Sequence, residues 1–282
     1  TVPEYKRETP PSTIVSMIYL KTEEEIELLR KANLLVSATL AEIAKIVRPG
    51  VTTRQLDTLA EQFIRDHGAT PTFKGFPASF AGAEPFPASL CTSVNNVVIH
   101  GIPDDVPLKE GDIVSVDCGT CLDGFCGDSC YTFCVGEVDE ETRRLLRITK
   151  ESLYRGIAAA LPGNRIGDIG AAVQQHCESQ GYGVVREFVG HGIGHDMHEE
   201  PPVPNYGRPG TGKLLKNGLC IAIEPMITQG SNAIALMPDR WGITTRDLSR
   251  AAHFEHTIAI HNGKPDILST FEPIEAIEGK LY

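Results

Sequence analysis

Two segments of the chain repeat one another, and each of them ends in a carboxylate. The first reads LKEGDIVSVD at 108–117, and the second reads LKNGLCIAIE at 215–224. In both, Leu-Lys and a glycine precede an apolar run typical of a buried strand, which closes on Asp117 or Glu224. A carboxylate at the end of a buried strand costs free energy unless it is paired or binds a cation. The repeat therefore predicts twin halves that meet at a seam, where both contribute acids to one metal site.

Two further pairs of motifs reinforce the repeat. A His-x-x-Pro sequence precedes each acid-ending strand, beginning at His100 in the first half and at His198 in the second. Upstream, a Pro-Gly pair and a later single glycine bracket a helical stretch in each half, at 49–68 and 162–181. The two halves therefore match along much of their length and not at the acids alone.

Hydrophobic periodicity gives the order of the elements. Apolar residues at steps of three and four predict helices at 22–47, 53–67, 139–161 and 166–180, and apolar runs between turn signals predict strands at 112–121, 125–135, 184–190, 219–225 and 252–261. A capping box at Thr22 opens the first helix, whose apolar face is interrupted by Asn33 alone. The order of two helices and then strands occurs twice. It favours an α+β fold in which helices cover one face of a curved, mostly antiparallel sheet.

The length of the chain leaves the number of domains open. At 282 residues it suffices for one large domain or two small ones. Because both halves share the predicted site, we expect one catalytic domain at 20–282 after an N-terminal extension at 1–19. Its pseudo-symmetric halves are expected at about 20–137 and 138–265.

Charge and cysteine usage restrict the function classes. The net charge of −11 disfavours nucleic acid or an anionic membrane as the main partner, since both need a basic surface. No apolar run approaches the roughly 18 residues of a transmembrane helix. Eight cysteines in a long chain without a recognisable secretion signal favour reduced thiols and a cytoplasmic location over a disulfide framework.

Five residues in the two halves form a candidate ligand set. Asp117 and Asp128 lie on the two strands of a predicted hairpin, which is expected to bring them opposite each other. Taken alone, this pair also fits a turn-capping Asp and a hydrogen-bonded core Asp. The second half adds Glu224 and Glu255 inside apolar runs and His191 in a Gly-rich segment. Four buried carboxylates repel one another without cations, and two divalent ions balance them. Oxygen ligands with one imidazole suit Mn, Fe, Co or Zn.

Such a pair of ions serves hydrolysis. Two metals about 3.5–4 Å apart share a water, lower its pKa towards roughly 7 and polarise a carbonyl group. His100 and His198, one from each half, are candidates to donate hydrogen bonds to a developing oxyanion or a leaving nitrogen. The residues themselves thus favour a metal-dependent hydrolase.

Seven motifs together resemble those of the type I methionine aminopeptidases. They occur in the family's order and close to its spacing over roughly 20–265, and they are HGIPD at 100–104, VD at 116–117, GDS at 127–129, GHGIG at 190–194, HEEP at 198–201, IEPM at 223–226 and FEHT at 254–257. The resemblance implies the pita-bread fold. It also implies metal-dependent hydrolytic removal of the initiator methionine from nascent polypeptides, with a preference for a small second residue.

The resemblance assigns roles around the metal ions. It makes the metal ligands Asp117, Asp128, His191, Glu224 and Glu255. In the family, the acids that match Asp128 and Glu255 bridge the two ions, and the acid that matches Glu224 also moves a proton from the water to the leaving amine. His100 and His198 resemble the histidines that contact the scissile peptide.

The resemblance also assigns a substrate pocket. Phe73, Phe76 and Cys91 resemble the lining of the methionine pocket, where an apolar and polarizable surface suits a thioether. Trp241 resembles an aromatic residue near the pocket entrance. The loop before Cys91 is about ten residues longer than usual, because FPAS occurs twice, at 76–79 and again ten residues later.

Three other residues depart from the family's pattern. Lys74 stands where some members carry a histidine and Met197 where some carry a phenylalanine, and both are expected to tune the residue accepted after methionine. His195 is an additional histidine in the Gly-rich segment. The glycines around it argue against a continuous helix that would align it as a ligand.

Two alternative functions remain, from different classes. A proline-specific aminopeptidase or prolidase usually carries an additional N-terminal domain. A non-enzymatic pita-bread binding protein is expected to have lost ligands, whereas all five ligand positions here carry ligand-type residues. The short span between Glu224 and Glu255 leaves little room for the helical insertion of the type II enzymes. We therefore expect a cytoplasmic monomer that acts on nascent peptide N-termini at the ribosome, without direct nucleic-acid or membrane binding.

Overall fold

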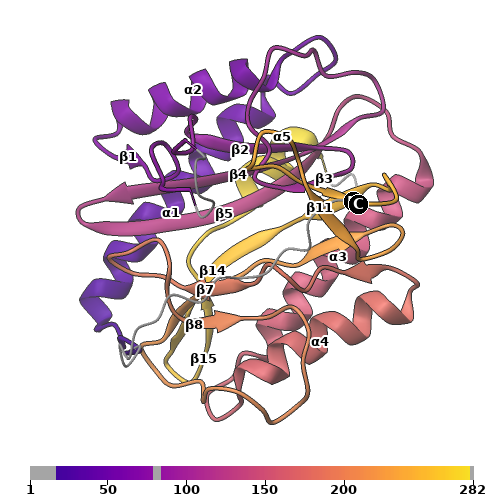
Figure 1. The fold of residues 1–282 in the computed structure, drawn as a ribbon. Coiled ribbons are helices and arrows are strands. Elements are labelled where there is room, and N and C mark those ends of the chain that lie inside the picture. Colours follow the sequence, from indigo (N-terminus) through magenta and orange to yellow (C-terminus); the bar gives the residue numbers. More distant parts are fainter. Residues whose placement is uncertain (1–16, 79–83, 280–282) are drawn as a thin grey trace.

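The computed structural model describes residues 17–78 and 84–279, so most of the extension expected at 1–19 lies outside the described residues (Figure 1). The helices are α1 (Glu23–Ala44), α2 (Thr53–Asp66), α3 (Glu140–Ala159), α4 (Ile166–Ser179) and α5 (Glu272–Glu278). The first four are the predicted helices, with ends that differ by less than one turn. The capping box predicted at Thr22 is present. At α1, the Thr22 hydroxyl accepts a hydrogen bond from the Glu25 N–H at 3.3 Å, and the Glu25 carboxylate accepts one from the Thr22 N–H at 2.8 Å.

The strands form one large sheet and two small ones. The large sheet has the order β1 (Thr70–Pro71), β4 (Ile113–Leu122), β5 (Phe125–Cys134), β14 (Glu255–His261), β9 (Cys220–Ile223), β7 (Gly190–Gly192) and β8 (Glu199–Val203), with β2 (Leu90–Val94) on β4 and β15 (Lys264–Ile267) on β14. The small sheets are β13 (Ala251–His253), β10 (Met226–Thr228), β6 (Gly183–Val184), and β11 (Ile234–Leu236), β12 (Ile243–Thr245), β3 (Val97–Ile99). All of the strand pairs in the described residues are antiparallel, as predicted.

Each helix pair covers the strands of its own half. Helix α1 packs on β4 and β5 (Figure 1), and α3 packs on β13 and β10 of a small sheet and on β9 and β14 of the large one. The side chains of Val114, Val116 and Cys118 on β4 belong to the apolar core shared with α1, whereas Asp117 lies between them on the opposite face of the strand. The helices therefore stabilise one face of the sheet and leave the other face free for the site.

The repeated motifs adopt the same hydrogen-bonding pattern in both halves. After the first helix of each pair, a Pro-Gly turn meets the leucine that opens the repeated segment. The Gly50 N–H donates to the Leu108 carbonyl at 2.8 Å, and the Gly163 N–H donates to the Leu215 carbonyl at 3.1 Å. The glycine of each Leu-Lys-x-Gly turn has nearly the same positive φ, 85° in one half and 87° in the other. Such a φ favours glycine, which explains why this residue recurs in both copies.

The halves meet where β5 lies beside β14, and this seam is secured mainly by side-chain hydroxyls. The two strands pair at only two register positions. The Ser129 hydroxyl donates to the Glu255 carbonyl at 2.6 Å, and the Thr257 hydroxyl donates to the Asp128 carbonyl at 2.9 Å. Two residues of the predicted ligand set are thus held across the seam through their own backbones.

Three predicted strands of the second half are wrong in extent. The run 184–190 is not one strand, because β6 and β7 belong to different sheets. The run 219–225 ends at β9, since Pro225 has no N–H to continue the ladder, and β10 follows in another sheet. The run 252–261 breaks at Phe254, whose ring is 5.1 Å from that of Tyr131, measured between centroids, in the core. Apolar runs do not reveal such changes of sheet.

Candidate metal centre and substrate pocket

The five predicted ligands lie on or directly after five adjacent strands, one for each strand. Asp117 is on β4, Asp128 on β5, Glu255 begins β14, Glu224 directly follows β9 and His191 is the middle residue of β7. These strands are consecutive neighbours in the large sheet. The structure therefore brings the acids of both halves to one place, with β14 at the centre.

The register of the hairpin differs from the predicted one. Asp117 pairs with Cys130, and Asp128 pairs with Gly119, so the two acids are diagonal neighbours and do not lie directly opposite each other. Because they are offset by two residues, both still project from the same face of the hairpin. The diagonal places their carboxyl groups side by side along the strands.

The ligating atoms converge closely. His191 Nε2 lies 3.5 Å from Asp128 Oδ2 and 3.6 Å from Glu224 Oε1. Asp128, His191 and Glu255 each offer an atom within 4.8 Å of the others, and all three side chains are buried. One oxygen each of Asp117, Asp128 and Glu255 is buried without a hydrogen-bond partner in the described residues. Unpartnered carboxylate oxygens beside an imidazole fit the donor set of a divalent ion.

The electrostatics of the cluster point the same way. Burial, together with the neighbouring carboxylates, raises the pKa values of Asp128, Glu224 and Glu255 well above their ordinary range, and burial raises the pKa of Asp117 to about 7. Burial lowers the pKa of His191 to about 3, so this imidazole is neutral and free to bind a metal. Four mutually repelling acids next to a neutral imidazole are the arrangement that cations stabilise. The residues therefore fit the metal ions that the sequence predicted.

The ligands line a cavity of about 350 Å³. Its lining consists of Phe73, Phe76, Phe86, Cys91, His100, Asp117, Asp128, His191, His198, Glu224, Trp241 and Glu255. Each residue that was predicted to bind metal or substrate is in this set. Carboxylates and histidines line one part of it, and aromatic rings with a thiol line another.

The two spare histidines approach the cavity from different segments. His100 has a φ of +58°, a left-handed conformation that is uncommon for a residue other than glycine and is typical of functional sites. Its ring meets that of Phe188 edge-on, with centroids 5.5 Å apart. The His198 ring lies against His191 at 4.3 Å and against Phe76 at 5.3 Å. Both imidazoles are placed beside the ligands without belonging to the close cluster.

The lengthened loop contributes an aromatic residue that the sequence analysis did not assign. Phe86 is 2% exposed, and its ring lies 5.0 Å from that of Trp241 in an edge-to-face contact. The Phe86 N–H donates to the Phe76 carbonyl at 2.9 Å, and the Gly75 N–H donates to the Phe86 carbonyl at 2.8 Å. These bonds bring the phenylalanines that begin the two copies of Phe-Pro-Ala-Ser together at the pocket. The Trp241 indole N–H donates to the Glu84 carbonyl at 3.0 Å and fixes the end of the loop.

The three residues that depart from the family's pattern lie outside the cavity lining. The ammonium group of Lys74 pairs with Glu61 on α2 at 2.7 Å, so the expectation that Lys74 tunes the second residue of the substrate is not supported by its position. Met197 is buried in the apolar cluster that contains Phe73. His195 is exposed, and its Nδ1 lies 2.8 Å from the Gly124 carbonyl oxygen.

Two polar residues of the site were missed. Asn33, the polar residue on the apolar face of α1, is fully buried, and its amide oxygen accepts a hydrogen bond from the Asp128 N–H at 3.1 Å. The one polar residue on an otherwise apolar helix face was the feature of the sequence that could have identified Asn33. His253 lies 3.7 Å from Glu224, and its place two residues before Glu255 was the only hint in the sequence.

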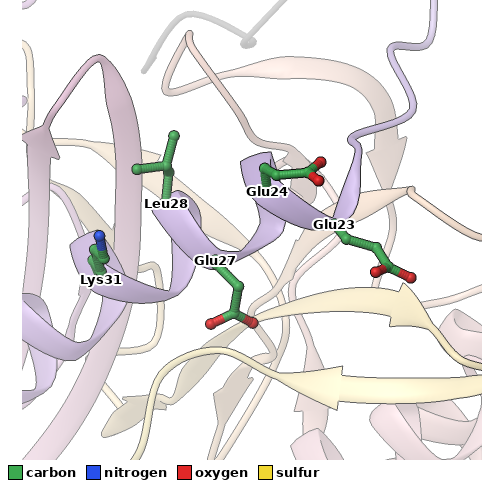
Figure 2. Close-up of a pocket in the computed structure, with 5 residues that line it drawn as sticks. All are labelled: Glu23, Glu24, Glu27, Leu28 and Lys31. Carbon is green, nitrogen blue, oxygen red and sulfur yellow. The ribbon is translucent and has the colours of Figure 1, made fainter.

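A second depression lies on α1 and has a different character (Figure 2). It is lined by Glu23, Glu24, Glu27, Leu28 and Lys31, which all come from one helix. No residue of the large sheet contributes to it. It therefore lacks the converging groups from separate elements that distinguish the cavity on the sheet.

The comparisons with known proteins agree with this geometry. The profile of metallopeptidase family M24 matches residues 27–262. The methionine aminopeptidase of Clostridium perfringens is 51% identical over 253 residues, which cover 90% of this chain and 99% of the relative. The crystal structure of methionine aminopeptidase from Rickettsia prowazekii superposes with a TM-score of 0.87 at 42% identity, over 90% of this chain and 100% of that one.

A more distant likeness concerns the fold alone. The prolidase from Pyrococcus furiosus has a TM-score of 0.71 at 24% identity, over 90% of this chain and 66% of that one. The expected pita-bread class is thus confirmed by the methionine aminopeptidase and the prolidase structures. The chain is more similar in sequence to the methionine aminopeptidase, at 42% identity against 24% for the prolidase. Taken with the five predicted ligands that five neighbouring strands bring together, these matches establish that the chain belongs to metallopeptidase family M24, among its bacterial-type methionine aminopeptidases.

Proposed function

We propose that the protein removes the N-terminal methionine from nascent polypeptides by metal-dependent hydrolysis and prefers a small residue after it. The observation that carries this proposal is the continuity of one cavity. It joins the carboxylate and histidine cluster to an apolar pocket formed by Phe73, Phe86 and Cys91, all of them buried. An apolar recess with a polarizable thiol suits a methionine side chain.

Each residue of the cluster has a proposed part in the reaction. Asp117, Asp128, His191, Glu224 and Glu255 would hold two divalent ions, of Co, Mn, Fe or Zn. Bound there, such ions lower the pKa of a water and polarise the scissile carbonyl. Glu224 accepts the proton of the attacking water and delivers it to the leaving amine. His100 and His198 donate hydrogen bonds to the scissile peptide as charge develops on it.

The organisation of the chain and its setting complete the proposal. Residues 20–282 act as one catalytic domain with pseudo-symmetric halves at 20–137 and 138–265, supported by the matching helix pairs and turns. None of the helices in 17–78 and 84–279 is both long and apolar enough to cross a membrane. We place the protein as a cytoplasmic monomer that meets its substrates at the ribosome and binds neither nucleic acid nor membrane directly.

The test uses metal-stripped protein that is reconstituted with Mn, Fe, Co or Zn in turn. Cleavage of Met-Ala-Ser and Ala-Pro-Ala is followed by mass spectrometry, with the Glu224→Gln variant as the inactive control. Metal-dependent loss of methionine alone is the expected result. Cleavage of Ala-Pro-Ala alone would assign a proline-specific peptidase, and cleavage of neither peptide with any ion would support a non-enzymatic binding protein.

A further inference from the structure

His253 is a buried polar residue at the metal centre to which the reaction gives no role. It ends β13, its side chain is 2% exposed, and its Nε2 has no hydrogen-bond partner among the described residues. The nearest acid is Glu224, whose Oε2 lies 3.7 Å from that nitrogen. A buried imidazole nitrogen without a partner is costly, so its retention points to a partner in the working enzyme.

The backbone of His253 is held so firmly that the imidazole stays at this place. The His253 N–H donates to the Thr132 hydroxyl oxygen at 3.1 Å, and the Thr132 hydroxyl donates to the His253 carbonyl at 2.7 Å. The Cys130 thiol donates to the same carbonyl at 3.6 Å. On the other side, His253 pairs with Met226 of β10. Bonds from β5 and β10 thus fix the residue from which the ring extends towards Glu224.

The carboxylate of Glu224 lies between two imidazoles. Its Oε1 is 3.6 Å from His191 Nε2, and its Oε2 is 3.7 Å from His253 Nε2. Asn205 holds the backbone of Glu224 by donating to its carbonyl at 2.9 Å, a contact that does not involve the carboxylate. The distance to His253 exceeds hydrogen-bond length by only about 0.5 Å, which a small torsion of the Glu224 side chain removes.

We propose that His253 is a positioning residue, which donates a hydrogen bond from Nε2 to Oε2 of Glu224 and so orients the carboxylate that binds metal and moves the proton. This inference rests on the proposed function. His191 faces one oxygen of Glu224, and His253 restrains the other, so the plane of the carboxylate is set from both sides. A partner of this kind typically changes metal affinity or turnover by about 10–100-fold when it is removed.

The test compares His253→Leu, which removes the donor, with His253→Gln, which keeps an N–H donor at similar reach. Metal affinity and stoichiometry are measured by titration calorimetry with Co²⁺, and kcat and KM are measured with Met-Ala-Ser. We expect His253→Leu to lower Co²⁺ affinity about 10-fold and kcat about 10–100-fold, with unchanged stoichiometry and little change in KM. His253→Gln should recover both quantities to within about three-fold of wild type, since the amide replaces the donor.

Matched controls keep the outcomes distinct. His176→Leu alters a histidine that pairs with Glu151 on the outer helices and should leave metal affinity unchanged. If His253→Leu does not fold, His253→Asn provides an amide of shorter reach, which should fail to restore affinity.

Wild-type Co²⁺ affinity and kcat in His253→Leu, or in His253→Asn in its place, would overturn the proposal. A changed stoichiometry, or a changed Co²⁺ absorption spectrum in His253→Gln, would overturn it in favour of a metal ligand. Because calorimetry needs no turnover, failure of the proposed function would appear separately, as wild-type protein that binds Co²⁺ without cleaving Met-Ala-Ser.

Discussion

The hairpin of β4 and β5 and the strands of the second half carry their predicted ligands in two different ways. Asp117 and Asp128 are interior residues of ten-residue strands that pair along their whole length. Glu224 and Glu255 lie where one strand ends and the chain passes to a strand of another sheet, and His191 is in a strand of three residues. A continuous ladder fixes a side chain by register alone, whereas a strand end needs additional bonds. Those bonds come from side chains at the seam and around Glu224.

The largest effect is expected at the acid that follows the broken strand β9. Glu224→Gln keeps the shape of the side chain but removes the base and one negative charge. We expect kcat for Met-Ala-Ser to fall by about 10³-fold or more, because proton transfer loses its carrier. The measurement is steady-state turnover at saturating metal, with metal content determined for the same sample. A kcat close to that of wild type would show that Glu224 is not the proton carrier.

Two glycines sharpen the comparison, because each precedes a ligand in one of the two regions. A Cβ on Gly127 of β5 would lie 2.5 Å from the backbone of Ala32 in α1, and one on Gly190 of β7 would lie 2.3 Å from the Ala222 carbonyl oxygen. In the long ladder the clash cannot be absorbed locally. Gly127→Ala should therefore lower the free energy of unfolding by about 3 kcal/mol.

The short strand should respond differently to the same change. Gly190→Ala moves a three-residue strand, so we expect a loss of metal affinity of about 10-fold with a smaller loss of stability. Chemical denaturation and calorimetric metal titration of both variants give the two quantities. Equal losses of stability in the two variants would remove the distinction between a rigid hairpin and adjustable strand ends.

A third variant tests the contact that supports the hairpin from the helix side. Asn33→Leu removes the acceptor of the Asp128 N–H, which is bonded at 3.1 Å in a fully buried position. Leaving that donor unsatisfied should cost about 2 kcal/mol of unfolding free energy. Leu34→Ala, on the exposed side of the same helix, should change it by less than about 0.5 kcal/mol. A similar small change for Asn33→Leu would mean that the ladder alone holds Asp128.

The smallest effect concerns pH and compares the site with and without metal. Burial lowers the pKa values of His100, His191, His253 and His256, so these side chains are neutral in the folded chain with or without metal, and the rise in stability that they give as the unfolded chain loses its protons is the same in both forms. The acids Asp128, Glu224 and Glu255 have raised pKa values in the folded state, so the stability from their protonated forms is lost as pH rises.

Relative to the metal-bound form, metal-free protein should consequently lose at least about 1 kcal/mol between pH 6.5 and 8, seen as a fall in Tm of about 2–4 °C relative to that form. Bound ions remove this slope, since they stabilise the ionised carboxylates. The raised pKa of Glu278, which lies outside the site, contributes equally with and without metal and cancels in the comparison. If Tm changed with pH equally in the metal-free and the metal-bound protein, the expected loss would be contradicted.

Local patterns in the sequence were sufficient to predict the first four helices, the hairpin of β4 and β5, and the candidate ligands that the structure brings together. Steps of three and four residues locate α1 to α4, and acids that close apolar runs identify Asp117 and Glu224. These features depend on neighbours along the chain, or on the chemistry of one residue type in an apolar setting. They therefore survive without knowledge of the tertiary structure.

The remaining features depend on partners that are distant in sequence. The break at Phe254 arises because its ring packs with Tyr131 and Phe271. Phe86 reaches the pocket because its backbone pairs with Phe76 and its ring meets Trp241. No periodicity in either segment encodes such a contact, and a repeated Phe-Pro-Ala-Ser motif does not say which copy faces the substrate.

The seam between β5 and β14 also has a consequence in time. Ser129 and Glu255, which bond across it, are 126 residues apart in the chain. During synthesis the hairpin of β4 and β5 can form from local contacts long before Glu255 has been added, because closing a short loop is fast and closing a long one is slow. At that stage Asp117 and Asp128 are in place, but the other predicted ligands have not yet joined them. Full loading with metal therefore requires that the growing chain has extended past β14, so that the strands of both halves have joined into one sheet.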